Sequence, residues 1–240
     1  MALIYNASFD SQTRILSLLD KAGDVISSCE VPSKDVDDIT KPLTLTATAD
    51  NSSVKLWMSG TVYNTYEVDK GNGWEDYTIR TTIHLNAGES CKWRCKAHPS
   101  TQTDARYVQF AMSGTIEASG NCNSMLSSNF ENITSISKYD HAFVGLFQDC
   151  TSLTKAPLLP ATILPPYGYY YMFDGCKSLT EVRISATTIA ANATNTLNNW
   201  LSGVSATGDF YCDPNATIFP SGESGIPTNW TRRNIADYPN

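Results

Sequence analysis

Residues 147–154 read FQDCTSLT, and residues 173–180 read FDGCKSLT. The two stretches share Phe, Cys, Ser, Leu and Thr at an offset of 26 residues, and the dipeptide Thr-Ile at 162–163 recurs at 188–189 with the same offset. Self-similarity at a fixed period is typical of repeat architectures, in which each unit buries its apolar side against its neighbours. The second half of the chain is therefore expected to form a short solenoid.

The apolar positions of the repeat predict which side chains face the solenoid core. A period of 26 lies within the range of about 20–29 residues of leucine-rich repeats, whose L-x-x-L-x-L pattern can be fitted to both copies. The fitted core positions are Leu153, Ala156 and Leu158 in the first copy, and Leu179, Val182 and Ile184 in the second. The side chains expected to face solvent are those of Thr154, Lys155, Pro157, Thr180, Glu181 and Arg183.

Two further repeated residues are expected to stack as ladders between coils. Phe147 recurs as Phe173, and Cys150 recurs as Cys176. A degenerate third copy begins at Trp200, where it loses the Cys and gains a Trp, as a terminal cap does. Together with Leu153 and Leu179, these Phe and Cys residues form the predicted repeat core.

Residues 42–120 are expected to form a small antiparallel β-sandwich of the immunoglobulin-like kind. Short runs of strand-forming residues follow one another at short intervals, at 43–47, 54–58, 82–85, 91–96 and 107–112. In the run CKWRCK, a period of two places Cys91, Trp93 and Cys95 on the inner face and the three cations outside.

The first 41 residues form a separate attachment element and linker in this interpretation. Residues 14–19 and 25–31 flank a turn-like DKAGD and predict a hairpin, although Ser11 is also a suitable cap for a short helix. Residues 118–145 connect the two regions and are expected to hold a short helical turn covering the open end of the solenoid. The predicted fold is therefore mainly β, with domains 1–41, 42–120 and 121–240.

Composition excludes several classes of partner. The 240 residues carry a formal net charge of −7, which argues against nucleic acid because its recognition needs clustered Lys and Arg. No run approaches 18 apolar residues, and no basic amphipathic stretch suggests a membrane surface. The seven cysteines are odd in number and scattered, so we expect reduced, buried thiols and not a disulfide framework.

The sequence lacks the motifs of common catalytic and metal sites. Only three histidines are present, and no H-E-x-x-H, G-x-S-x-G or phosphate-binding loop occurs. The best metal candidate is Cys91, Cys95 and His98, but a continuous strand separates the two thiols by about 13 Å. Asp174, Glu181 and Asp209 read as solvating carboxylates. We therefore expect no enzymatic activity, no metal and no cofactor.

Four tyrosines in five positions form the strongest candidate binding site. Tyrosine offers a flat apolar face and a hydroxyl, which suits contact with a glycan or a protein. In the alternative interpretation one or two of the rings pack inside the solenoid. The candidate ligand-binding residues are Tyr167, Tyr169, Tyr170, Tyr171, Lys155 and Arg183.

Two repeats and a cap are too few to bury a core alone, since about three repeats are normally needed. The solenoid is therefore expected to lean on the β-sandwich, on a partner chain or on both. We predict a homo-oligomer on this ground.

The motifs resemble those of a known family. Residues 149–162 (DCTSLTKAPLLPAT) and 171–180 (YMFDGCKSLT) resemble the BspA-like leucine-rich repeats of gut Bacteroidales and their phages. Residues 200–205 (WLSGVS) and 225–231 (GIPTNWT) are similar to the usual ending of that family, and residues 42–120 are similar to the β-sandwich that precedes such repeats.

The resemblance implies a surface protein that acts in adhesion and carries no catalytic residues. The chain shows no export signal and its array is short, and both features fit a phage virion component assembled in the host cytoplasm. A head fibre or capsid decoration protein of a crAss-like phage is therefore expected, docked on other virion proteins through its N-terminal piece. It would display a surface for a host or mucosal glycan or protein. The alternative is a bacterial cell-surface adhesin whose signal is missing.

Overall fold

The computed structural model describes residues 6–10, 15–19, 22, 25–30, 39–58, 65–97 and 107–238. By its internal contacts the chain divides into two compact units, Met1–Asp37 and Asp38–Asn240. The β-sandwich and the repeats, expected as separate domains, thus lie in one unit.

The first unit contains one three-stranded antiparallel sheet. Its strands, in spatial order, are β1 (Asn6–Asp10), β2 (Ile15–Leu19) and β3 (Val25–Glu30). The hairpin of β2 and β3 confirms the sequence prediction, whereas β1 was not expected. Residues 32–38 of the predicted linker and Ser11 lie outside the described residues.

The second unit is mainly β and is dominated by one nine-stranded sheet. In spatial order its strands are β17 (Trp230–Asn234), β16 (Gly208–Cys212), β14 (Glu181–Ile184), β12 (Leu153–Leu159), β11 (Ile116–Ser119), β4 (Leu43–Ala47), β9 (Ser90–Ala97), β6 (Thr65–Asp69) and β7 (Trp74–Asp76). A three-stranded sheet has the order β10 (Val108–Ser113), β5 (Ser52–Met58) and β8 (Ile83–Leu85). The remaining elements are the parallel pair β13 (Ile163–Leu164) and β15 (Thr188–Ile189), and the 3₁₀ turns η1 (Cys122–Met125), η2 (Phe130–Asn132) and η3 (Ile235–Asp237).

The two sheets of the N-terminal half of this unit pack against each other through aromatic side chains. Trp93 of β9 meets Phe110 of β10 edge to face, with ring centroids 5.2 Å apart. The predicted alternation in β9 is confirmed, because Cys91, Trp93 and Cys95 are all fully buried. Strands β6 and β7 were not predicted, and they supply the carboxylates that pair with the outward-facing cations of β9.

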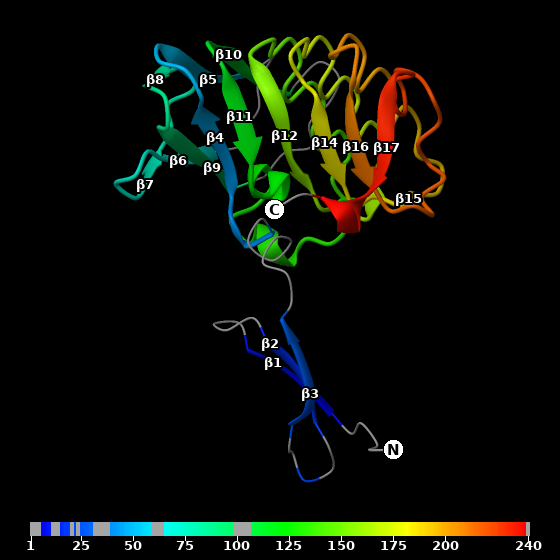
Figure 1. Cartoon of the computed structure of the whole chain (residues 1–240). Helices are drawn as coiled ribbons and strands as arrows, with labels where there is room; N and C mark the ends of the chain where they lie inside the picture. The colour runs from blue at the N-terminus through cyan, green and yellow to red at the C-terminus, as the bar shows by residue number, and fades with distance from the viewer. Residues whose placement is uncertain are drawn as a thin grey trace. The chain divides into compact units, whose positions relative to one another are not determined.

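The nine-stranded sheet changes from antiparallel to parallel at β11. This strand pairs antiparallel with β4 and parallel with β12, so the sheet runs without a break from the first strands into the repeats (Figure 1). Gly120 follows β11 with φ of +73°, and a Cβ added there would lie 2.1 Å from the backbone oxygen of Pro42. Only glycine lets the two segments approach so closely.

The repeats form a β-solenoid-like arrangement of about three turns, with β12, β14, β16 and β17 side by side and parallel (Figure 1). Each coil contributes one strand to the large sheet. The repeat-core residues identified in the sequence lie in the interior with at most 1% exposure: Phe147, Cys150, Leu153, Phe173, Cys176 and Leu179.

Two details of the predicted alternation are wrong. The register between β12 and β14 shifts between Lys155 and Leu158, and Pro157 is consequently buried while Ala156 is only half-buried. Arg183 was expected to face solvent but is 4% exposed, because the ring of Tyr238 lies 4.3 Å from its guanidinium carbon.

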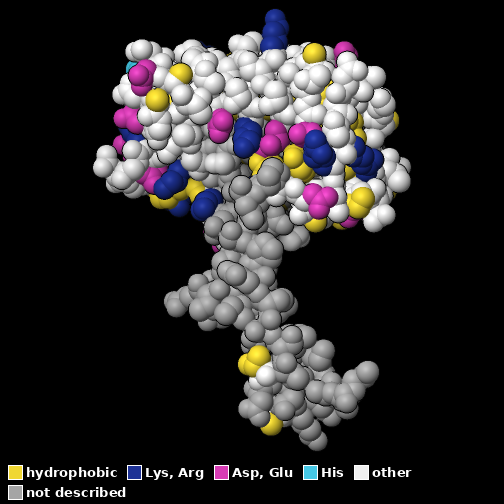
Figure 2. Space-filling model, viewed as in Figure 1, with side chains coloured by type: hydrophobic (Ala, Val, Ile, Leu, Met, Phe, Trp, Pro, Cys, Tyr) yellow, Lys and Arg dark blue, Asp and Glu magenta, His cyan; other side chains and the backbone are white. Residues whose placement is uncertain are grey.

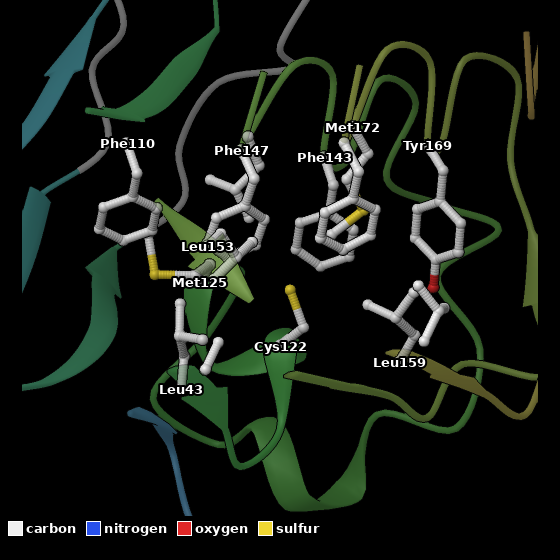
Figure 3. Packing of buried hydrophobic residues seen from close by; sticks show 14 of the residues in the cluster. Leu43, Phe110, Cys122, Met125, Phe143, Phe147, Leu153, Leu159, Tyr169 and Met172 are labelled. Atoms are coloured by element: carbon white, nitrogen blue, oxygen red, sulfur yellow. The ribbon is translucent and has the colours of Figure 1, made fainter. Parts of the chain in front are cut away.

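Stacked rings join the repeats to the antiparallel strands that precede them. The centroids of Phe110 and Phe147 are 5.4 Å apart, as are those of Phe147 and Phe173, with ring planes within 17° and 2° of parallel. Figure 3 shows Phe110 and Phe147 in the same core as Leu43 and Leu153. Since Phe110 belongs to β10, the strands before the repeats supply the first ring of the ladder, and the repeats pack against it. The homo-oligomer stays a prediction.

The expected helical turn after residue 120 is present as η1, and its four residues are buried. The hydroxyl of Ser124 donates to the backbone oxygen of Trp93 at 2.8 Å and accepts from the backbone N–H of Leu43 at 2.9 Å. These two bonds fasten η1 to strands β4 and β9. No helix among the described residues is long and apolar enough to cross a membrane.

Candidate binding surface

The segment of each coil opposite the parallel strands is a ribbon of consecutive turns. Every fourth residue of this turn ribbon has a positive φ, between 51° and 74°. These residues are His141, Gly145 and Asp149 in the first coil, Tyr167, Tyr171 and Gly175 in the second, and Asn195, Asn199 and Gly203 in the third. Alternate backbone N–H groups donate to the next coil, for example Phe147 to Met172 and Phe173 to Trp200, both at 2.9 Å. These bonds hold neighbouring turn ribbons in register.

Two tyrosines of the second coil occupy backbone positions that do not suit them. Tyr167 and Tyr171 both have φ of 53°, the left-handed region, which costs a residue with a large side chain about 1–2 kcal/mol. The equivalent residues of the third coil are Asn195 and Asn199, the type that tolerates this conformation best after glycine. Backbone geometry therefore does not account for tyrosine at these two positions, and unfavourable backbone conformations concentrate at functional sites.

The tyrosines form a continuous aromatic patch on the turn ribbon. The ring of His141 stacks on that of Tyr167 at 4.4 Å and 6°. Tyr167 meets Tyr170 at 5.3 Å, and Tyr170 meets Tyr171 at 4.3 Å, both edge to face. These four residues, all half-buried, are called the tyrosine patch below. Asn199 of the third coil contacts the last ring of the patch, because its Nδ2 donates a hydrogen bond to the Tyr171 hydroxyl at 3.2 Å.

Tyr169 does not belong to the patch. It is fully buried between Phe143 and Trp200, with centroid distances of 5.8 Å to each ring. Burial raises the pKa of its hydroxyl well above the usual value. Its oxygen has no hydrogen-bond partner among the described residues. The alternative interpretation, in which one of the rings packs inside the solenoid, is therefore right for Tyr169.

The two candidate cations lie away from the tyrosines. Lys155 belongs to β12, where its Nζ is 3.8 Å from Glu181, and Arg183 is buried in β14 under Tyr238. Sequence reasoning also missed His141, although it precedes Tyr167 by 26 residues, the repeat period. The periodicity of the turn ribbon was the signal that could have identified it.

The described residues offer no group of three or more His, Cys, Asp or Glu side chains arranged to hold a metal ion. His98 of the candidate metal motif lies outside them. The six cysteines whose side chains the structure describes are all free and buried, as expected. Burial raises the pKa of the Cys91 thiol to about 12. It also raises the pKa of the thiols of Cys122, Cys150 and Cys176. Thiols of this kind are poor nucleophiles.

No family model, no curated protein and no solved structure matches the chain. Function is therefore inferred from the residues and their geometry.

Proposed function

We propose that the chain is a non-enzymatic virion surface protein, a head fibre or capsid decoration protein of a phage that infects Bacteroidales. In this proposal the first unit docks on other virion proteins and the second displays a binding surface for a host or mucosal glycan or protein. The repeats are taken as a short BspA-like leucine-rich-repeat array, and the preceding strands as an immunoglobulin-like sandwich. One parallel strand per coil and the buried leucines of the repeat support that interpretation.

The tyrosine patch is the observation that carries the binding role. Aromatic rings with polar ends are the side chains that most often dominate recognition surfaces, because they bury a large area with few rotatable bonds. Here the bonds between coils keep the backbone beneath the rings fixed, so little conformational freedom is lost when a ligand binds. Retaining two tyrosines in an unfavourable backbone region is consistent with selection for binding.

The first unit supports the attachment role through its size and sequence. A unit of 37 residues is below the size at which a chain usually buries a sufficient core of its own. Its strand register places Phe9 opposite Leu16 and Leu16 opposite Cys29, which forms a row of apolar residues across the sheet. Such an element gains stability by docking on a partner.

Mass spectrometry of purified phage particles tests the proposal directly. We expect the protein in tens to hundreds of copies per particle, and we expect particles assembled with a chain lacking residues 1–37 to be devoid of it. The truncated chain retains every buried hydrophobic core residue among those whose side chains the structure describes, so it should fold. Detection of the protein in the bacterial envelope, and not in particles, would favour the adhesin.

A further inference from the structure

A band of charged side chains crosses the parallel strands on the face of the large sheet (Figure 2). The strand register makes Glu117, Lys155, Glu181, Asp209 and Thr231 successive partners on β11, β12, β14, β16 and β17. Five consecutive strands thus each contribute one polar side chain to a single line. We call these five residues the polar row.

The polar row lies in a groove of about 510 Å³, whose lining also includes Thr154 and Thr180. The side chains are accessible from solvent, with exposed fractions of 41% for Lys155, 18% for Glu181 and 36% for Asp209. The groove is therefore an open channel that follows the row across the strands.

The lining of the groove is rich in hydrogen-bond acceptors. The hydroxyl of Thr154 donates to the backbone oxygen of Ile116 at 3.2 Å, and that of Thr180 donates to the backbone oxygen of Thr154 at 3.3 Å. Since a hydroxyl has a single donor, both oxygens are left with acceptor capacity. The carboxylates of the row can only accept hydrogen bonds. A complementary ligand must therefore supply many O–H or N–H donors.

Cations already balance two of the three carboxylates. Asp209 accepts a hydrogen bond from Arg233 Nε at 2.6 Å, and Lys155 Nζ lies 3.8 Å from Glu181. The hydroxyl of Tyr238 also donates to Glu181. These two carboxylates are thus held in place and the charge of the row is partly neutralised, which favours a neutral ligand with hydroxyl donors over a cationic one.

The spacing of the row indicates an extended polymer. Neighbouring strands are about 4.8 Å apart, so the row repeats at nearly the length of one sugar residue in an extended chain and spans about 19 Å. We infer that the groove binds a neutral polysaccharide that runs across the strands, with about one sugar residue per interval between neighbouring strands and thus about four in all. This inference goes beyond the proposed function, since it applies whether the chain is carried on a virion or on a cell.

Titration calorimetry of the full chain tests the inference with linear neutral oligosaccharides of two to six glucose, mannose or galactose residues. For at least one series, affinity should rise tenfold or more from the disaccharide to the tetrasaccharide and then level off. Glu117→Gln and Asp209→Asn should each weaken the tetrasaccharide at least fivefold. Glu131→Gln, an exposed carboxylate outside the groove, is the matched control and should change nothing.

Chemical protection gives a second readout that needs no variant. Acetylation by an N-hydroxysuccinimide ester should slow at Lys155 when the tetrasaccharide is bound. It should not slow at Lys70, whose side chain is similarly exposed at 48% and lies on the β-sandwich side. Absence of oligosaccharide binding at millimolar concentration, unprotected Lys155, or preferential binding of hexalysine would each overturn the inference. None of these results bears on whether the protein is found in particles.

Discussion

Cys176 donates a hydrogen bond from Sγ to the backbone oxygen of Phe147, 3.0 Å away and one coil back along the solenoid. Cys150 makes the same contact with Phe110, at 3.2 Å. The repeated Phe and Cys therefore act together. Each Phe ring stacks on the preceding ring of the ladder, and each Cys thiol donates a hydrogen bond to the backbone oxygen of that preceding Phe. Because Phe110 lies in β10, this arrangement begins in the strands that precede the repeats and couples the two parts of the second unit.

Truncation of the last stacked phenylalanine of the ladder should therefore destabilise the whole second unit. Phe173→Ala removes a fully buried side chain in contact with Phe147 and Trp200, and should lower the free energy of unfolding by about 3–5 kcal/mol. Urea denaturation followed by tryptophan fluorescence measures the loss. Ile163→Ala, at a half-buried position of β13, should cost clearly less. A loss below about 1 kcal/mol at Phe173 would contradict the ladder model.

Close backbone approach at the end of β11 predicts a strong glycine requirement. Gly120→Ala places a Cβ against the backbone oxygen of Pro42, whereas Gly71→Ala meets nothing within 4 Å, and both residues have positive φ. Backbone strain is present in both variants and is greater at the +104° of Gly71 than at the +73° of Gly120, whereas the clash is specific to Gly120. We expect Gly120→Ala to cost at least about 2 kcal/mol more than Gly71→Ala in the same denaturation experiment. Equal costs would mean that the two segments move apart easily.

The buried thiols predict a loss of stability at alkaline pH. Burial raises the pKa of Cys91 in the folded chain to about 12, against about 8.5 in an unfolded chain. The unfolded state therefore releases protons first, and the stabilisation present below about pH 8.5 declines as the pH rises towards 12. Each such thiol contributes up to about 1.4 kcal/mol per pH unit. Unfolding free energies of reduced protein between pH 7.5 and 10 test this, and Cys91→Ala should flatten the slope; a flat profile in the parent chain would refute it.

Removal of the Tyr169 hydroxyl should not harm the fold. The group is buried and has no hydrogen-bond partner among the described residues, so its desolvation is uncompensated. Tyr169→Phe should leave stability unchanged or raise it by up to about 1 kcal/mol, with the stacking on Trp200 retained. Thermal denaturation measures the change, and a fall of more than about 1 kcal/mol would indicate a partner for the hydroxyl.

The tyrosine patch should affect binding more than stability. Tyr170→Ala and Tyr171→Asn should each weaken adsorption to host capsule by about 1 kcal/mol, or roughly fivefold. Asparagine relieves the unfavourable φ of Tyr171, which offsets part of the lost ring contact. Tyr169→Phe is the matched control for these surface variants. If a chain that carries both Tyr170→Ala and Tyr171→Asn adsorbs as well as the parent chain, the tyrosine patch is not a binding site.

Much of the fold could be predicted because repeats and alternation are local patterns. The Phe and Cys ladders and the buried face of β9 follow from spacing alone. Strands β6 and β7 could not be predicted in this way, since their carboxylates are stabilised by cations of β9 that lie 20 or more residues away. The burial of Arg183 depends on Tyr238, 55 residues later in the chain.

The candidate site was predicted only in part, for a related reason. A tyrosine-rich run reveals an aromatic surface, but the turn geometry decides that Tyr169 points inward and that His141 joins the patch. The polar row was not predicted as a unit at all. Its members come from five separate strands, and only the register between those strands brings them into line.

The sequence by itself determined that the chain is mainly β and that a 26-residue unit repeats with Phe, Cys and Leu inside, because the period of apolar residues selects the face that must leave water. Only the tertiary structure decided that β11 joins the antiparallel strands and the parallel strands of the repeats into one sheet, that Phe110 begins the ring ladder, and that the polar row lines a groove. These features arise from pairing between segments that are distant in the chain, and such pairing depends on packing that no local pattern encodes.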